Sequence, residues 1–201
     1  MKTINNIDKM AAEYGFSICD IPSVIYKIFK EKLEKVTSVS ELNSTTISSG
    51  EVINSLGYVD NELVESILKI VNPLEEIKRI HNLSQRFDEI KRNPKEIDIK
   101  SYEREINKAL GILIEDGLFA FAIWLESENK EPHKVIKETS FHILKNEHIN
   151  LIKNSNDLKN AVLNEISTDL QKLLLARQIL ERMLIYARYR AKSLNNSNEG
   201  E

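Results

Sequence analysis

Apolar residues recur every three or four positions along most of the chain, the spacing that places them on one side of an α-helix. We find no convincing stretch of the alternating apolar and polar residues that mark a half-buried strand. The pattern therefore predicts an all-α protein. We expect a compact bundle of about seven to eight helices, with room for an inserted helical segment.

The longest nearly uncharged stretch, Leu110 to Leu125, predicts the centre of this bundle. It contains the single tryptophan, Trp124, and is interrupted by Glu115, Asp116 and Gly117. We expect two helices meeting at a corner, with Gly117 as a left-handed C-cap, because a residue without Cβ takes positive φ at little cost. The second helix is apolar on almost every face. We therefore expect it to be enclosed, with Trp124 buried by the corner and the last helix.

Capping residues, prolines and glycines divide the rest of the chain into further predicted helices. In order, these are a short start within residues 1–15, a helix beginning at Asp20 and Pro22, segments 52–56, 60–71, 73–92, 131–144 and 158–166, and a long last helix capped by Ser167. Asp169 is placed favourably in the first turn of that last helix.

A change in composition suggests how the chain is divided. Eight of the fourteen residues from Thr37 to Gly50 are Ser or Thr, which predicts an exposed loop, ordered or disordered. We expect N-terminal bundle helices over 1–36, a Ser/Thr-rich loop and inserted helical segment over 37–96, a core bundle over 97–194, and a disordered tail over 195–201.

Composition indicates where in the cell the protein is expected. A single cysteine, Cys19, excludes an internal disulfide and fits a reducing environment. The longest apolar stretch is split by two carboxylates, whereas a membrane span needs about 20 continuous apolar residues. No basic segment followed by an apolar one opens the chain. We expect a cytoplasmic protein with no membrane association.

Catalytic motifs are hard to find. The six glycines are too far apart for a phosphate-binding loop, and the four histidines never pair four residues apart on a helix. We predict no catalytic residues, no metal site and no cofactor, and hence no enzyme activity.

The last helix departs from this pattern. Residues 171 to 192 include six basic residues and only one acid, Glu181, although the whole chain carries a net charge of -3. Arginine binds phosphate through two parallel hydrogen bonds, and tyrosine offers a flat face to bases. The candidate residues for contact with a nucleic-acid backbone are Arg177, Arg182, Arg188, Arg190, Lys192, Tyr186 and Tyr189, with Lys134 and Lys137 as a second surface. Cations that complement the dipole of a C-terminal helix are the simpler alternative.

Two segments carry a resemblance to a known family. A helix led by Tyr102, then Leu110 to Leu113 entering Glu115, Asp116, Gly117 and Leu118, then Ala122 to Leu125, resembles the P-x-L-I-x-x-N-G-L…l-A-F-L segment of one CRISPR protein family. That family is the small helical subunit of the type III-B effector, the Cmr complex. The final helix is similar too, with Tyr186, Arg188 and Ala191 at its aromatic, basic and small positions. Gly111 replaces the usual proline, and Asp116 the usual asparagine.

This resemblance implies a non-catalytic subunit that stacks in several copies beside the duplex of guide RNA and target RNA. Its partners would be that RNA, other effector subunits and neighbouring copies of itself. Guide–target pairing would then supply sequence specificity, and the protein would contact RNA backbone. The competing hypothesis is a helical adaptor or regulatory protein that binds only protein.

Overall fold

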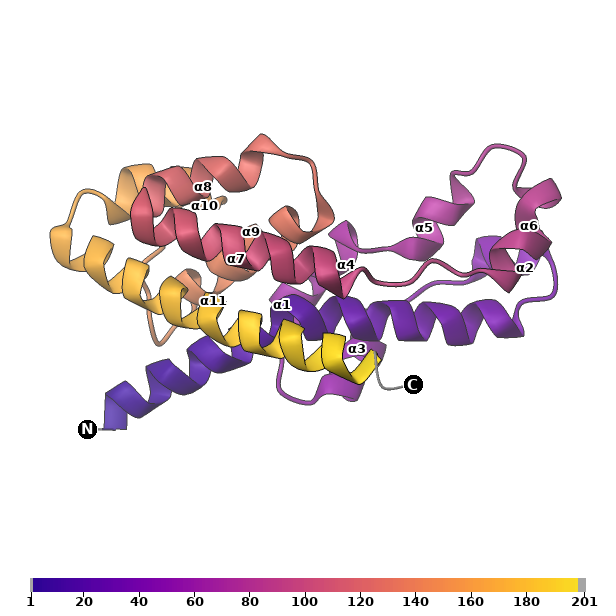
Figure 1. The fold of residues 1–201 in the computed structure, drawn as a ribbon, viewed down its shortest axis with the longest axis horizontal. Helices are drawn as coiled ribbons and strands as arrows, with labels where there is room; N and C mark the ends of the chain where they lie inside the picture. Colours follow the sequence, from indigo (N-terminus) through magenta and orange to yellow (C-terminus); the bar gives the residue numbers. More distant parts are fainter. Residues whose placement is uncertain (1, 199–201) are drawn as a thin grey trace. The chain divides into compact units, whose positions relative to one another are not determined.

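The computed structural model describes the backbone of residues 2–198 and the side chains of residues 7–197. Every regular element in that range is helical (Figure 1). The prediction of an all-α protein is therefore confirmed. The described chain forms two compact units: one combines the start of the chain up to Cys19 with the chain from Asp98 onward, and the other is Asp20–Ile97.

The division between the units falls inside the first helix. Helix α1 (Lys2–Lys35) is continuous, with Pro22 in its interior, so the predicted helix start at Asp20 and Pro22 is wrong. Proline removes one backbone hydrogen bond from a helix. The helical spacing of buried residues nevertheless continues past it through Ile25 and Phe29. The second unit thus begins at Asp20, whereas the predicted inserted segment began at residue 37.

Five further helices build the unit Asp20–Ile97: α2 (Val39–Ser44), α3 (Ser49–Leu56), α4 (Asn61–Ile70), α5 (Pro73–Lys78) and α6 (Leu83–Arg92). The predicted loop over residues 37–50 therefore contains α2 and the start of α3. Its serines act as N-caps: Ser38 accepts from the Glu41 amide, and Ser48 forms a reciprocal capping box with Glu51. Leu42 and Ile47 are buried, which gives the segment a packed side.

The single helix predicted over residues 73–92 is also wrong, because α5 and α6 are separate. Asn82 has φ +59° and ψ +38°, a left-handed conformation that ends regular α-helical geometry. The predicted apolar side is still buried on both pieces, at Leu74 and Ile77 before the break and at Phe87 and Ile90 after it.

The other unit contains α7 (Ile99–Glu115), α8 (Leu118–Ser127), α9 (Glu131–Lys145), α10 (Leu158–Ala161), the π-helix η1 (Val162–Ile166) and α11 (Leu170–Asn198). Helix α11 packs along α7 (Figure 1). It begins after Asp169, which accepts hydrogen bonds from the Gln171 and Lys172 amides at 2.8 and 3.3 Å. The predicted cap Ser167 instead ends η1.

The predicted disordered tail is helical as far as Asn198, and residues 199–201 lie outside the described residues. Asn195 donates a hydrogen bond of 2.6 Å from Nδ2 to Glu103 Oε2 on α7. This contact between helices extends α11 past the end at residue 194 expected from its sequence.

Close packing of α1 against α11 depends on Gly15. A Cβ at this position would collide with the carbonyl oxygen of Met183 and would lie 3.0 Å from the Tyr186 Cβ. Ala11 and Ala187 are fully buried in the same unit. Small side chains thus allow the two backbones to approach.

The corner between α7 and α8 forms at Gly117, as predicted, but with a different geometry. Gly117 has φ +89° and ψ -179°, a region populated almost only by glycine, and serves as the N-cap of α8. Its amide donates to the Ile112 carbonyl at 3.1 Å. The positive φ is confirmed, whereas the C-cap of α7 is Asp116.

Helix α8 is not enclosed, contrary to prediction. Phe119 and Ile123 are each 45% exposed, while Phe121 and Leu125 on the opposite side are buried. Trp124 is half-buried, and its ring stacks on His133 of α9 with centroids 4.2 Å apart. The prediction that the corner and the last helix bury Trp124 is therefore wrong.

Candidate nucleic-acid interface

The basic residues of α11 fall into two groups in the structure. Arg177, nearest the start of the helix, donates from Nη2 to the carbonyl oxygen of Ile114 at 2.8 Å. It therefore satisfies a carbonyl at the C-terminal end of α7, as cations commonly do. This contact explains Arg177 without any nucleic acid.

Arg182 and Tyr186 share one acidic partner. Arg182 Nη1 lies 3.4 Å from Asp8 Oδ1, and the Tyr186 hydroxyl donates to Asp8 Oδ2 at 3.0 Å. The Asp8 carboxylate raises the pKa of Tyr186. Both side chains thus join α11 to α1, and sequence analysis missed Asp8 because it lies 174 residues away from Arg182.

Arg188, Tyr189 and Lys192 form an exposed group, which we call the basic strip. Tyr189 is 61% exposed, Lys192 is exposed and Arg188 is half-buried. Among the described residues, no hydrogen bond or ion pair engages Arg188 or Lys192. Arg190 is half-buried and already has a partner in the protein. The strip thus offers two cations and an aromatic face to a ligand.

The second predicted surface, on α9, is compensated at Lys137. Lys137 Nζ lies 3.9 Å from Glu126 of α8, and Glu126 also pairs with Lys159 at 2.8 Å. Lys134 is half-buried. Lys137 thus lies beside an acid, whereas among the described residues no hydrogen bond or ion pair engages the Lys134 side chain.

A buried ion cluster in this unit was not predicted. The Glu105 side chain is fully buried on α7, 3.1 Å from both His133 Nε2 and Arg104 Nε. Lys130 and Lys108 lie 3.4 and 3.5 Å from the same carboxylate. Glu105 lies between Tyr102 and Ala109 on the buried side of α7. An acid at a buried helical position is the sequence feature that could have predicted this cluster.

Burial by itself raises the pKa of Glu105. The hydrogen bonds from His133 and Arg104 and the charges of Lys108 and Lys130 outweigh it and lower the pKa to about 2. The cluster therefore holds a carboxylate in its charged form. His133 Nδ1 is buried without a hydrogen-bond partner among the described residues. The cations near Glu105 are thus already paired.

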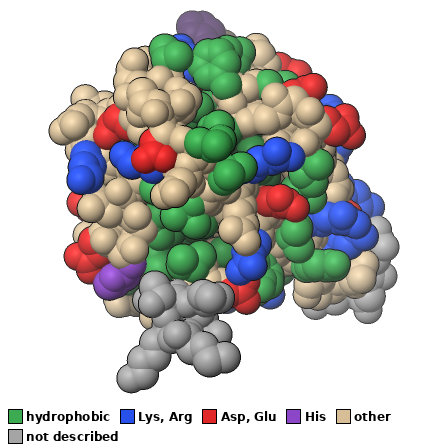
Figure 2. All heavy atoms as spheres, turned by 90° about the vertical axis from the view of Figure 1, so that its left-hand side faces the viewer, with side chains coloured by type: hydrophobic (Ala, Val, Ile, Leu, Met, Phe, Trp, Pro, Cys, Tyr) green, Lys and Arg blue, Asp and Glu red, His purple; other side chains and the backbone are tan. Residues whose placement is uncertain are grey.

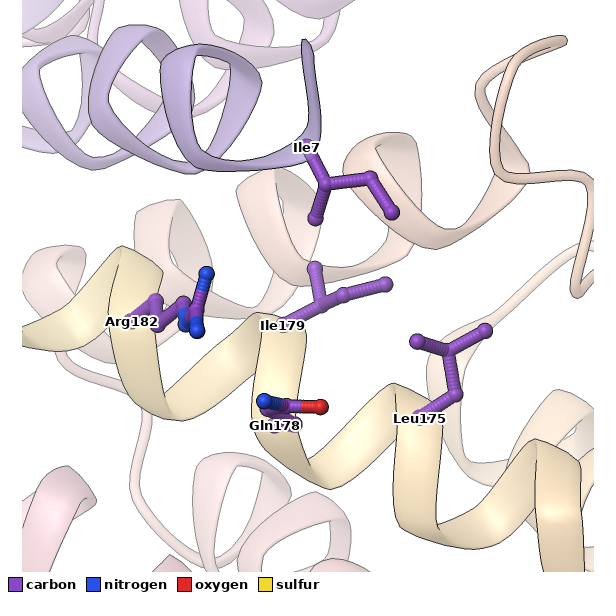
Figure 3. A pocket seen from close by; sticks show the side chains of 5 residues that line it. All are labelled: Ile7, Leu175, Gln178, Ile179 and Arg182. Atoms are coloured by element: carbon purple, nitrogen blue, oxygen red, sulfur yellow. The ribbon is translucent and has the colours of Figure 1, made fainter. Parts of the chain in front are cut away.

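Each unit contains a recess among its described residues. The first, of about 270 Å³, is an apolar groove between the start of α1 and α11 (Figure 3), lined by Ile7, Leu175, Gln178, Ile179 and Arg182. The second, of about 490 Å³, is polar and mixes Lys30, Lys91 and Arg92 with Glu34 and Glu96. Within the described residues, no group of three or more His, Cys, Asp or Glu side chains could hold a metal.

Comparison of the chain with protein-family models, with curated proteins and with solved structures gives no match. Among the described helices, none combines the length and apolar character needed to cross a membrane.

Proposed function

We propose that this protein is a non-catalytic, all-helical small subunit of a type III-B CRISPR ribonucleoprotein, and that it contacts RNA backbone through the basic strip. The observation that carries the proposal is the exposure of Tyr189 and Lys192 beside the half-buried Arg188, whose charge no described residue pairs, on a protein of net charge -3. A local basic surface on an acidic protein calls for a negatively charged ligand.

The chemistry of the strip suits single- or double-stranded RNA. Arg188 can form paired hydrogen bonds with a phosphate, Lys192 adds a point charge, and Tyr189 offers a face for stacking. Two cations give only a weak contact with an isolated copy. Several copies held side by side by partner subunits would bind one RNA much more tightly, because each added contact is then intramolecular.

The arrangement of the helices also supports the proposal. The segments that resemble the Cmr subunit are the α7–α8 corner and α11, and both belong to the same compact unit. Ala191, at the small position of the resemblance, is fully buried on α11 beside the exposed Lys192. The basic residues can therefore face outward while the helix stays anchored.

The test is to purify the tagged protein from its native cells and to ask which molecules accompany it. Recovery of guide-length RNA with several other subunits supports the proposal. Replacement of both Arg188 and Lys192 by Glu should reduce the RNA recovered. The slope of log affinity against log salt should become shallower by about one unit for each phosphate that the variant no longer binds.

A matched control carries the same charge change elsewhere, with Lys153 and Lys172 replaced by Glu. It should keep RNA binding, because neither lysine belongs to the strip. If the protein assembles without RNA, or if the two double variants behave alike, the RNA-binding proposal fails.

A second candidate, a helical adaptor that binds only protein, has its own supporting observation. Leu170 and Leu174 at the start of α11 are 68% and 57% exposed. Apolar side chains exposed together commonly mark a protein interface. Recovery of partner proteins without RNA would favour this candidate.

A further inference from the structure

Exposed apolar side chains concentrate at one place in the first unit. Seven of the nine large hydrophobic residues that are exposed in the described chain lie on α7, α8, η1 and the first two turns of α11. The other two are Tyr58 and Tyr189, and Tyr189 lies near the C-terminal end of α11. We define the corner surface by six of the seven: Ile114, Phe119, Ile123, Leu163, Leu170 and Leu174. The seventh, Leu175, lines the apolar groove of Figure 3.

The elements that carry these residues are in mutual contact. The π-helix η1 packs against both α8 and α11, so Leu163 lies on an element shared by the two. The hydrogen bond from Arg177 to the Ile114 carbonyl joins α11 to the end of α7. Figure 2 views the side on which α11 begins, and hydrophobic side chains form a band down that face. The six residues of the corner surface thus lie on elements that are in mutual contact.

The positions of its residues suit a helical ligand. Phe119 and Ile123 on α8 are four residues apart, as are Leu170 and Leu174 on α11. Each pair lies along one side of its helix and forms a ridge. Ile114 lies on α7 and Leu163 on η1, and each of these elements packs against both α8 and α11. An amphipathic helix binds such a surface by inserting apolar side chains spaced three and four residues apart.

The charges next to the corner surface are mainly acidic. Glu115, Asp116 and Asp169 are exposed beside it in the chain. Helix α7 ends with Glu115 at the negative end of its dipole and has no basic residue in its last turn. The Arg177 guanidinium at the Ile114 carbonyl offsets this end of the dipole, but among the described residues no hydrogen bond or ion pair engages the Glu115 and Asp116 side chains. Arg177 is already bonded to Ile114, which leaves Lys172 as the nearby cation on α11.

We propose that the corner surface docks an amphipathic helix of another protein, with an apolar stripe flanked by Lys and Arg. Burying the apolar ridges provides the affinity, and the acids select a basic partner over an acidic one. The proposal does not depend on RNA binding by the basic strip, because the residues of the two surfaces differ.

The test uses the full-length protein and two defined helical peptides of about 18 residues. Both have leucines at helical spacing; one is flanked by Lys and the other by Glu. Fluorescence anisotropy should show binding of the Lys-flanked peptide, with affinity that falls as salt rises. The Leu174→Asp variant, and separately a variant with Glu115 and Asp116 both replaced by Lys, should bind it about tenfold more weakly.

Ser193→Asp is the control, because it places the same charge at an exposed position of α11 outside the corner surface. It should bind the Lys-flanked peptide as the unmodified protein does, and melting curves should show that all variants are folded. Three results would overturn the proposal: no binding of the Lys-flanked peptide, equal binding of both peptides, or a dimer in sedimentation that Leu174→Asp abolishes. The last result would mean that a second copy occupies the surface.

Discussion

At the scale of single residues, Glu105 is the most deeply buried acid in the described chain. It is fully buried and lies within 3.5 Å of His133 and three cationic side chains. Such a carboxylate depends on its partners, because a buried charge left without them carries a large desolvation cost. An apolar side chain at position 105 could fill the same buried space without any of these charges.

Replacing Glu105 by Gln should destabilise the protein by about 1–3 kcal/mol, because the hydrogen bonds with His133 and Arg104 lose their charged acceptor. Urea unfolding near neutral pH measures the change. The charge-removing control is Glu147→Gln, since Glu147 is an exposed acid. Equal stability of the two variants would contradict the role given to Glu105.

The same carboxylate sets a pH dependence. The pKa of Glu105 is about 2 in the folded protein against 4.5 as its ordinary value. A depressed folded-state pKa stabilises the protein above the unfolded value, and this stability is lost as the pH falls from 4.5 towards 2. The Glu105→Gln variant should therefore lose less stability than the unmodified protein over this interval.

Gly117 provides a prediction about the backbone. Gly117→Val should destabilise by more than about 1 kcal/mol, because a β-branched residue is strained at φ +89°. Gly111→Ala is the control: it lies inside α7 with no atom near its added Cβ, and alanine favours helix. If thermal melting places both variants at or above the unmodified protein, the corner does not require glycine.

At the scale of helices, the packing of α1 on α11 reverses the usual preference for alanine over glycine. Gly15 lies in the interior of α1, where alanine would normally stabilise by roughly 0.5–1 kcal/mol. Its added Cβ would instead meet the α11 backbone at Met183.

We therefore expect Gly15→Ala to destabilise by about 1–3 kcal/mol, as overpacking commonly does. Chemical denaturation, with Gly111→Ala again as the comparison, measures the difference. A gain of stability in both alanine variants would mean that α1 and α11 do not approach closely at this point.

A charged side chain also fixes the loop between α9 and α10. Glu165 on η1 accepts hydrogen bonds from the backbone amides of Lys153, Asn154 and Ser155 at 2.8, 3.2 and 2.7 Å. The hydrogen bond of the Ser155 side chain, together with these amides, lowers the pKa of Glu165 to about 2 against the effect of burial. This carboxylate fastens the connection between α9 and α10, which contains no helix of its own.

At the scale of the whole molecule, charge and apolar exposure separate along α11. The helix begins with the exposed leucines of the corner surface, and the basic strip lies near its other end. An α-helix rises about 1.5 Å per residue, so the 29 residues of α11 are long enough to keep two kinds of surface apart. Protein binding at one end and RNA binding at the other are therefore compatible in one subunit.

The sequence by itself determined that this protein is helical, and it identified most of the buried sides. Helical spacing depends only on local geometry, so residues such as Leu113 and Phe121 could be assigned to the core directly. It also indicated a corner at Gly117. Prediction from local sequence failed where one residue fits two structures. Pro22 is typical of the first turn of a helix, but here it lies inside α1.

Only the tertiary structure decided which charged residues are available. Arg177, Arg182 and Arg188 are equivalent in a sequence pattern, yet the first bonds to a carbonyl of α7, the second to Asp8, and the third to no described residue. Such pairings join positions far apart in the chain, and local spacing carries no information about them. The exposed side of α8 has the same origin, because a uniformly apolar helix does not show which of its faces the neighbouring helices leave uncovered.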